Sequence, residues 1–129
     1  MSDAVVLDAS ALLAPLGKKT GWERVHDALP SAAISTVNLA EVAGKLLERG
    51  ATHDEVAALL DLGIESVPFD QSMAFAAAQL RPVTRPLGLS LGDRCCLATA
   101  WCPSRAVLTA DISWRRTDVD GLDIQLLRR

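Results

Sequence analysis

The fold is decided near the N-terminus by the stretch Val5-Val6-Leu7-Asp8-Ala9-Ser10-Ala11-Leu12-Leu13-Ala14. The apolar run at residues 4–7 is short and typical of a buried strand. Asp8 and Ser10 are residue types that begin helices, and residues 11–14 have a helical pattern until Pro15 interrupts it. The stretch therefore predicts a strand, a turn that carries an acidic side chain, and a helix.

The same alternation continues along the chain. With capping residues included, further helices are predicted at residues 20–29, 35–50, 52–63, 70–80 and 90–101. Further strands are predicted at residues 32–35, 64–67, 106–109 and 124–127. The prolines and glycine of residues 81–88 predict a loop. Short strands that alternate with helices describe a parallel sheet covered on both faces, which is an α/β fold.

Length and composition are those of one globular domain. The chain has 129 residues, of which 50% are hydrophobic and 22% charged, so a single domain over residues 1–129 is expected. No apolar stretch approaches the roughly 20 residues needed to cross a bilayer. Cys95, Cys96 and Cys102 have no C-x-x-C spacing, so neither a zinc site nor a disulfide framework is predicted. A cytoplasmic location fits these thiols.

The overall charge argues at first against a nucleic-acid partner. The net charge is −3 and the pI is near 5.3, whereas phosphate binding usually rests on a basic surface. A net charge is a sum over sites, however, and acids gathered in one pocket would mask basic residues around its rim. The candidates for this rim are Lys18, Lys19, Arg81, Arg85, Arg94, Arg115 and Arg116.

Four acidic residues lie where a parallel sheet would bring them to one edge. Asp8 follows the first predicted strand and Asp111 follows the fourth, so both would project from the carboxyl ends of parallel strands. Glu41 lies within two turns of the start of the helix after the second strand. Asp93 lies in the first turn of the helix that leads into the fourth strand. We therefore expect these acids to converge.

Such a group of acids needs a positive counter-charge. Two carboxylates ~4 Å apart repel by about 4 kcal/mol at an effective dielectric constant of ~20. Protonation relieves this repulsion, and so does a divalent cation such as Mg²⁺ or Mn²⁺, which prefers oxygen ligands. A metal ion held by acids and water is suited to phosphodiester hydrolysis.

Each acid also has a purely structural explanation. Asp93 completes a capping box with the serine three residues before it, and Asp8 and Asp111 stand where a helix or a helical turn begins. Glu41 and Lys45 have the spacing of an i,i+4 ion pair. A serine hydrolase is disfavoured because the chain has no G-x-S-x-G motif. No single acid therefore establishes a metal site.

Four motifs together resemble the PIN domain, and in particular the VapC toxins of bacterial toxin–antitoxin pairs. They are the stretch quoted above, Val37-Asn38-Leu39-Ala40-Glu41-Val42, Leu89-Ser90-Leu91-Gly92-Asp93-Arg94-Cys95-Cys96-Leu97-Ala98 and Val107-Leu108-Thr109-Ala110-Asp111. Their order and spacing are those of the family, and the resemblance extends from Val5 to the last strand near Leu127. Each motif alone is weakly specific, but the four in register form a strong signal.

The resemblance implies both a fold and a set of site residues. It implies a three-layer sandwich whose five-stranded parallel sheet has the order 3-2-1-4-5 and is covered by helices on both faces. It also implies that Mg²⁺ or Mn²⁺ is held by four catalytic acids, which are Asp8, Glu41, Asp93 and Asp111. Ser10 and Thr109 would support the first and the last of these acids by hydrogen bonds.

The resemblance further implies an activity and partners. The expected activity is that of an endoribonuclease toward structured RNA such as tRNA, acting as a homodimer that a VapB-like antitoxin inhibits. Arg115 and Arg116, which lie close to Asp111, are expected to contact RNA phosphates. A different class of function remains open. In that alternative the chain is a PIN-like protein without turnover, and its acids receive a basic residue of an antitoxin or other binding partner.

Overall fold

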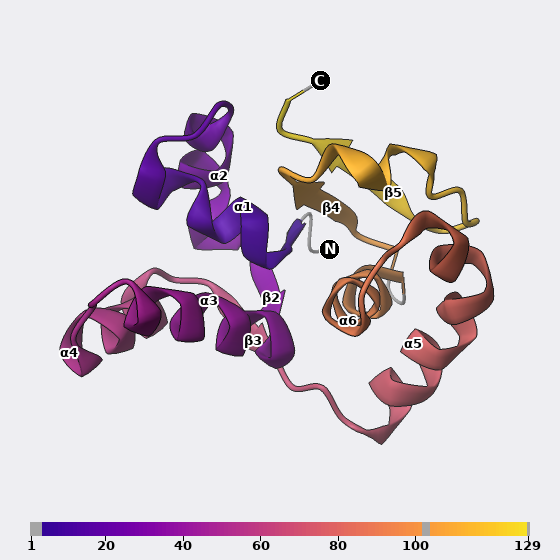
Figure 1. Cartoon of the computed structure of the whole chain (residues 1–129), viewed down its shortest axis with the longest axis horizontal. Helices are drawn as coiled ribbons and strands as arrows, with labels where there is room; N and C mark the ends of the chain where they lie inside the picture. Colours follow the sequence, from indigo (N-terminus) through magenta and orange to yellow (C-terminus); the bar gives the residue numbers. More distant parts are fainter. Residues whose placement is uncertain (1–3, 102–103, 129) are drawn as a thin grey trace.

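The computed structural model describes residues 4–101 and 104–128, and its strands form one five-stranded parallel sheet (Figure 1). The strand order is β3-β2-β1-β4-β5, and every neighbouring pair is parallel. The strands are β1 (Val6–Leu7), β2 (Ala33–Ser35), β3 (Glu65–Val67), β4 (Ala106–Thr109) and β5 (Asp123–Leu126). The predicted α/β class and the predicted strand order are confirmed.

The helices cover both faces of this sheet. They are α1 (Ala9–Leu13), α2 (Trp22–Ala28), α3 (Thr36–Glu48), α4 (His53–Ala57), α5 (Gln71–Thr84) and α6 (Leu91–Trp101). Short 3₁₀ helices are η1 (Pro15–Gly17), η2 (Leu29–Ser31), η3 (Ala58–Asp61), η4 (Arg85–Leu87) and η5 (Ile112–Arg116). Core residues of α1, α2 and α3 pack on one face, and core residues of α5 and α6 pack on the other. This gives the three layers that were predicted.

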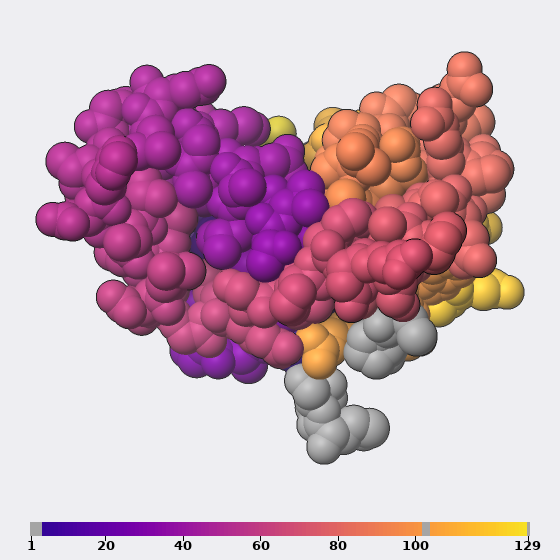
Figure 2. Space-filling model, turned by 90° about the horizontal axis from the view of Figure 1, so that it is seen from below, coloured from indigo at the N-terminus to yellow at the C-terminus, as the bar shows by residue number. Residues whose placement is uncertain are grey.

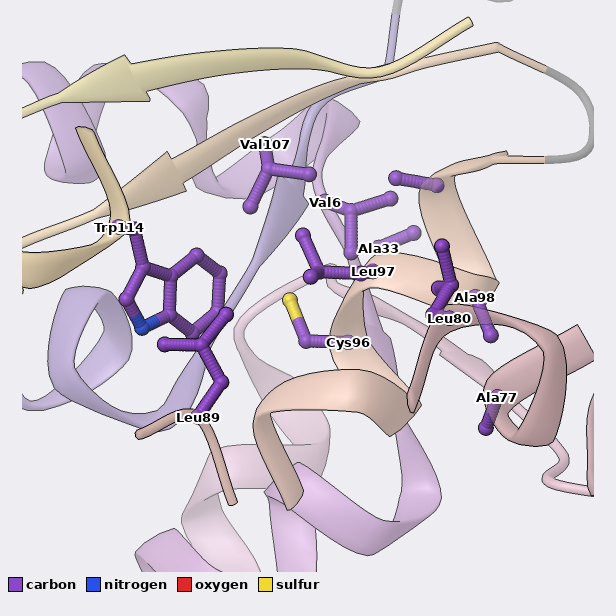
Figure 3. Packing of buried hydrophobic residues seen from close by; sticks show 11 residues of the cluster. Val6, Ala33, Ala77, Leu80, Leu89, Cys96, Leu97, Ala98, Val107 and Trp114 are labelled. Carbon is purple, nitrogen blue, oxygen red and sulfur yellow. The ribbon is translucent and has the colours of Figure 1, made fainter. Parts of the chain in front are cut away.

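The core is divided between the two faces because successive residues of a strand point in opposite directions. Val6, Ala33 and Val107 pack with residues of α5 and α6 and with Trp114, as Figure 3 shows. Their neighbours on the same strands, Leu7, Ile34 and Leu108, pack in the cluster that contains α1, α2 and α3. The central strands therefore bury both of their faces, as expected for short apolar runs in a parallel sheet.

Several helices begin at the capping residues that the sequence predicts. The side chains of Asp8, Ser35 and Asp70 each accept a hydrogen bond from a backbone N–H in the first turn of the following helix. Thr52 and Glu55 form the predicted capping box. The segment after this box is divided into α4 and η3 instead of forming one helix.

The end of α5 differs from the prediction. A loop was predicted at residues 81–88, but the helix continues through Pro82 to Thr84 and η4 follows directly. Proline removes one helical N–H and strains the preceding turn, which costs about 3 kcal/mol in a helix interior. Leu80 and Thr84 are nevertheless fully buried, and the Thr84 hydroxyl donates to the Leu80 carbonyl at 2.7 Å. The burial of this last turn favours the helix over the loop.

Two further features bear on the sequence predictions. Across residues 4–101 and 104–128, no helix is long and apolar enough to cross a membrane. Cys95 and Cys96 are buried on α6 as free thiols, and Cys102 lies outside the described residues.

Gly21 places α2 against the end of the chain and gives a first testable prediction. Its φ is +84°, and an added Cβ would lie 2.5 Å from the backbone oxygen of Leu127. We expect Gly21→Ala to lower the free energy of unfolding by about 2 kcal/mol, because it combines left-handed strain with a clash against backbone. Urea unfolding followed by circular dichroism measures this change.

Gly50→Ala is the matched control. Gly50 has a similar φ of +94°, but no atom of residues 4–101 or 104–128 beyond its chain neighbours lies within 4 Å of its added Cβ. This variant should lose only the strain contribution, about 1 kcal/mol. Equal losses in the two variants would contradict a role for the contact with Leu127.

Candidate functional site

Asp8 lies at the carboxyl end of β1, in the middle of the sheet, and is 5% exposed. Its Oδ1 accepts hydrogen bonds from the backbone N–H of Ala11 and the hydroxyl of Ser10, each at 2.8 Å. Its Oδ2 accepts from the hydroxyl of Thr109 at 2.7 Å. Ser10 Oγ also accepts from the backbone N–H of Ala110 at 3.0 Å. Ser10 and Thr109 therefore both hold Asp8, and they join β1 and α1 to the end of β4.

Burial leaves Asp8 with an unbalanced charge. It raises the pKa of Asp8 from 3.8 to about 6, against the lowering effect of the hydrogen bonds from Thr109, Ala11 and Ser10. The negative charge of Asp93 raises this pKa further. Within the described part of the chain, no Lys or Arg forms an ion pair with Asp8. Asp8 is therefore a buried carboxyl that has no positive partner in the described residues.

Asp93 is both a helix cap and a member of the acidic group. Its Oδ2 accepts from the backbone N–H of Ser90 at 2.8 Å, and its own N–H donates to Ser90 Oγ at 3.1 Å, so the predicted capping box is present. Burial raises the pKa of Asp93, and the charges of Asp111 and Glu41 raise it further. Asp93 therefore caps the helix and also lies close enough to Asp111 and Glu41 for their charges to act on it.

Glu41 is held at the junction of α3 and α6 by an asparagine. The side-chain amide of Asn38 donates to Glu41 Oε1 at 2.8 Å and to the backbone oxygen of Gly92 at 3.0 Å. The ion pair that the spacing of Glu41 and Lys45 suggested is not formed among the described residues. Sequence reasoning missed the role of Asn38. The available signal was a polar residue one helical turn before Glu41.

Asp111 follows β4 and caps η5, as its position predicted. Its Oδ1 accepts from the backbone N–H of Ser113 at 2.9 Å and from the Ser113 hydroxyl at 2.7 Å. Its own backbone N–H donates to Thr109 Oγ1 at 3.0 Å. Because Thr109 also donates to Asp8, one threonine hydroxyl links the backbone of Asp111 to the carboxylate of Asp8.

The four acids share one region but do not form a closed ligand group. Figure 2 shows a hollow between the surfaces of α3 and α6, the two helices that carry Glu41 and Asp93. Within residues 4–101 and 104–128, no three His, Cys, Asp or Glu side chains form a group that could hold a metal ion as they stand. No hydrogen bond in the described residues reaches Asp93 Oδ1, Asp111 Oδ2 or Glu41 Oε2. These oxygens are available to a ligand.

The predicted rim arginines fall into two classes. Arg115 and Arg116 lie on η5, are exposed, and line with Asp111 a pocket of about 400 Å³. Arg94 is buried instead, and its guanidinium donates to the backbone oxygen of Leu89 at 3.1 Å, so its place on the rim was predicted wrongly. An arginine in the first turn of a helix can bury its side chain and donate hydrogen bonds to nearby backbone carbonyls. Its position in the sequence does not show whether it does so.

The chain matches a known protein family over most of its length. The family model of the PIN domain matches residues 5–120. The chain belongs to the PIN domain family. The resemblance drawn from the four sequence motifs is thereby confirmed, and the match includes all four acids of the candidate site.

Several solved structures have a similar fold. A toxin–antitoxin complex from Klebsiella pneumoniae has a chain with 20% identity and a TM-score of 0.71, which covers 92% of this chain and 95% of that one. A DNA-bound VapBC from Salmonella typhimurium has 18% identity and a TM-score of 0.72, with 98% and 99% covered. VapBC-5 from Mycobacterium tuberculosis has 26% identity and a TM-score of 0.63, with 95% and 97% covered. No curated protein matches the chain. The PIN domain is thus similar in fold to VapC-type toxins.

Proposed function

We propose that this PIN domain is a metal-dependent endoribonuclease that cleaves structured RNA, with tRNA as the foremost candidate, and that it acts in the cytoplasm as the toxin of a toxin–antitoxin pair. The observation that carries the proposal is Asp8, a carboxyl that is buried at the edge of the sheet near Asp93 and has no cationic partner among the described residues. Asp93 acts on it electrostatically, and Asp111 and Glu41 act on Asp93. A divalent cation would relieve the mutual repulsion of these acids.

The donor set fits a hard divalent cation. All candidate ligands are carboxylate oxygens, which Mg²⁺ and Mn²⁺ prefer, and we assign them to Asp8, Asp93, Glu41 and Asp111. Asp8 is fixed by its hydrogen bonds, whereas Glu41 is exposed and Asp111 is partly exposed, so these two have room to rotate toward an ion. When bound, the ion supplies Lewis-acid polarisation of the phosphodiester and lowers the pKa of a bound water.

The other residues of the site position these acids and the substrate. Ser10 and Thr109 hold the Asp8 carboxylate in one orientation, and Asn38 donates to one carboxylate oxygen of Glu41 and keeps this side chain near the site. Arg115 and Arg116 are exposed beside Asp111, where guanidinium groups can bind phosphate oxygens by paired hydrogen bonds. The RNA backbone would thus be held by charge while the acids act on one of its phosphodiesters.

Mapping of cleavage sites tests this function most directly. After induced expression, the new 5′ ends in total RNA are sequenced to identify the RNA that is cleaved. An intact transcript of this RNA is then treated with purified protein. We expect cleavage at defined positions of a structured RNA that requires Mg²⁺ or Mn²⁺ and stops when a chelator is added. Cleavage that persists in excess chelator would contradict metal dependence, and an uncut transcriptome would contradict the nuclease.

The regulatory partner is proposed from the relatives. The structural matches are to VapBC and other toxin–antitoxin complexes, and on this basis we propose a VapB-like antitoxin for this chain. We propose a homodimer as well, from the resemblance of its sequence motifs to the VapC toxins. The product of a small adjacent reading frame should copurify with the chain and silence cleavage. An active chain without such a neighbour would remove the toxin assignment and leave a general PIN nuclease.

A second candidate function rests on the open arrangement of the acids. Because no closed metal-binding group forms in the described residues, the chain can alternatively be a silent PIN-like protein whose acids bind a basic residue of a partner. This alternative predicts partner binding that Asp93→Asn weakens, with no cleavage at any metal concentration. RNA cleavage that depends on added metal would contradict it.

Gly92 provides a test of the proposed role of Glu41. An added Cβ at Gly92 would lie 2.6 Å from Glu41 Oε1 and 3.0 Å from its Cδ. Because it meets the end of a flexible side chain, we expect Gly92→Ala to displace the carboxylate and lower kcat/KM for RNA by about tenfold. Stability should change by less than about 1 kcal/mol. Steady-state cleavage and thermal unfolding measure the two effects.

Gly44→Ala is the matched control for this substitution. Gly44 is a helical glycine on α3, and apart from its own helix no described residue lies within 4 Å of its added Cβ. The variant should keep its activity and gain slightly in stability. Equal activity of the Gly92 and Gly44 variants would show that the position of Glu41 does not matter for cleavage.

A further inference from the structure

A second pocket that reaches Asp111 has a strongly basic lining. Its volume is about 410 Å³, and its walls come from the turn after α1, the end of α3, and the residues after β4 and β5. The residues that we call the basic pocket are Lys19, Lys45, Arg49 and Arg128. Among the described residues of this lining, Asp111 is the acidic one. Of these basic residues, sequence reasoning had found only Lys19.

The charges of the basic pocket are not neutralised by the protein. In the described residues the ion pairs are His26–Asp27 and Glu65–Arg105, and neither involves the pocket. Arg128 Nε donates to the Ala110 carbonyl at 3.3 Å, which holds the guanidinium beside Asp111, and its other N–H groups donate to none of the described residues. Four like charges around one pocket, in a chain of net charge −3, form a local site for an anion.

The basic pocket is continuous with the acidic site. Ser10 and Asp111 line it, and Ser10 Oγ donates to both carboxylate oxygens of Asp8 at 2.8 and 2.9 Å. An anion in the pocket would therefore lie next to the acids without contacting Asp8 itself. This arrangement suits a polyanion that has one phosphate at the acids and another in the pocket.

We propose that the basic pocket binds a backbone phosphate adjacent to the phosphodiester that the acids cleave, and so fixes the position of the RNA along the site. This inference rests on the proposed nuclease function. The pocket volume lies in the range of about 300–1,000 Å³ that is typical of ligand sites. Guanidinium and ammonium groups together suit phosphate, and their exposure allows a flexible strand to enter.

The test compares two double variants with the same change of net charge. Lys19→Ala/Arg49→Ala removes two charges of the pocket. Arg24→Ala/Arg105→Ala removes two charges whose residues line neither pocket that reaches Asp111. Binding of a fluorescein-labelled RNA hairpin is followed by anisotropy at several salt concentrations, with chelator present to prevent cleavage. Thermal unfolding checks that both variants remain folded.

We expect the pocket variant to bind RNA about tenfold more weakly, and its salt dependence of log K to be less steep by about 1 to 2. The control variant should stay within about twofold of the parent chain. In steady-state cleavage, the pocket variant should raise KM and leave kcat at saturating RNA unchanged.

Equal losses in the two variants would overturn the proposal, because they would show a general effect of charge. Unchanged RNA binding in the pocket variant would also overturn it. If that variant kept its RNA binding but no longer bound a copurifying protein, the pocket would be assigned to that protein. A parent chain that binds no RNA would overturn both the pocket and the nuclease. Pocket-dependent binding without cleavage in Mg²⁺ or Mn²⁺ would support the pocket and refute the nuclease.

Discussion

Asp8→Asn is expected to lower kcat/KM for RNA cleavage by at least about 100-fold, because it removes the charge of the most buried acid of the site. The asparagine oxygen can still accept the backbone N–H of Ala11, so the cap of α1 remains. The fold should therefore survive. The measurement is single-turnover cleavage of a mapped RNA in Mg²⁺, with circular dichroism as a check of structure.

Asp70→Asn is the matched control for this prediction. Asp70 also caps a helix, accepting from the backbone N–H of Met73 at 3.0 Å, but it lies at the start of α5, outside the acidic group. Its variant should cleave RNA at the rate of the parent chain. Cleavage by Asp8→Asn at the same rate as by Asp70→Asn would count decisively against a metal role for Asp8.

Asp8→Asn is also expected to stabilise the metal-free protein, by up to about 3 kcal/mol at pH 8. Burial raises the pKa of Asp8 from 3.8 to about 6, and each unit of difference corresponds to about 1.4 kcal/mol. Between these two values the folded state binds more protons than the unfolded state, so stability falls as the pH rises through about 6. Above about pH 6 the ionised Asp8 destabilises the fold by the full amount, and below its unfolded pKa of 3.8 this destabilisation disappears.

Urea unfolding in chelator at about pH 4 and pH 8 measures this effect. The gain from Asp8→Asn should be largest at the higher pH and shrink toward zero at the lower one. Added Mg²⁺ should favour the parent chain over the Asp8 variant, since an ion at 100 times its Kd stabilises by about 2.7 kcal/mol. A gain that is independent of pH would refute the assignment to the ionised carboxyl.

Much of the fold follows from patterns that span a few residues. The caps at Asp8, Thr52 and Asp70 and the short apolar strands were predictable because each depends on neighbours within about one helical turn or one strand. The failure at Pro82 has the opposite cause. A local preference for a loop was outweighed by the burial of Leu80 and Thr84, which depends on packing and not on local sequence.

The acids of the candidate site were predictable from the sequence, but the contacts of the side chains around them were not. The sequence placed the four acids at the ends of elements, and the resemblance to PIN domains put them in one set. Three features were not predictable: the role of Asn38, the inward turn of Arg94 and the absence of an ion pair between Glu41 and Lys45 in the described residues. Each depends on which element lies against which, because side chains choose among partners that only packing brings near.

The sequence by itself therefore determined which elements form, where they begin, and which carboxylates stand at their ends. Only the tertiary structure decided that Asp8 would be buried and bonded by Thr109, a residue 101 positions away, and that Lys19, Arg49 and Arg128 would line one pocket beside it. The physical reason is one of range. Caps and strand patterns act between near neighbours, whereas desolvation and charge act through space and depend on segments that only the folded sheet brings together.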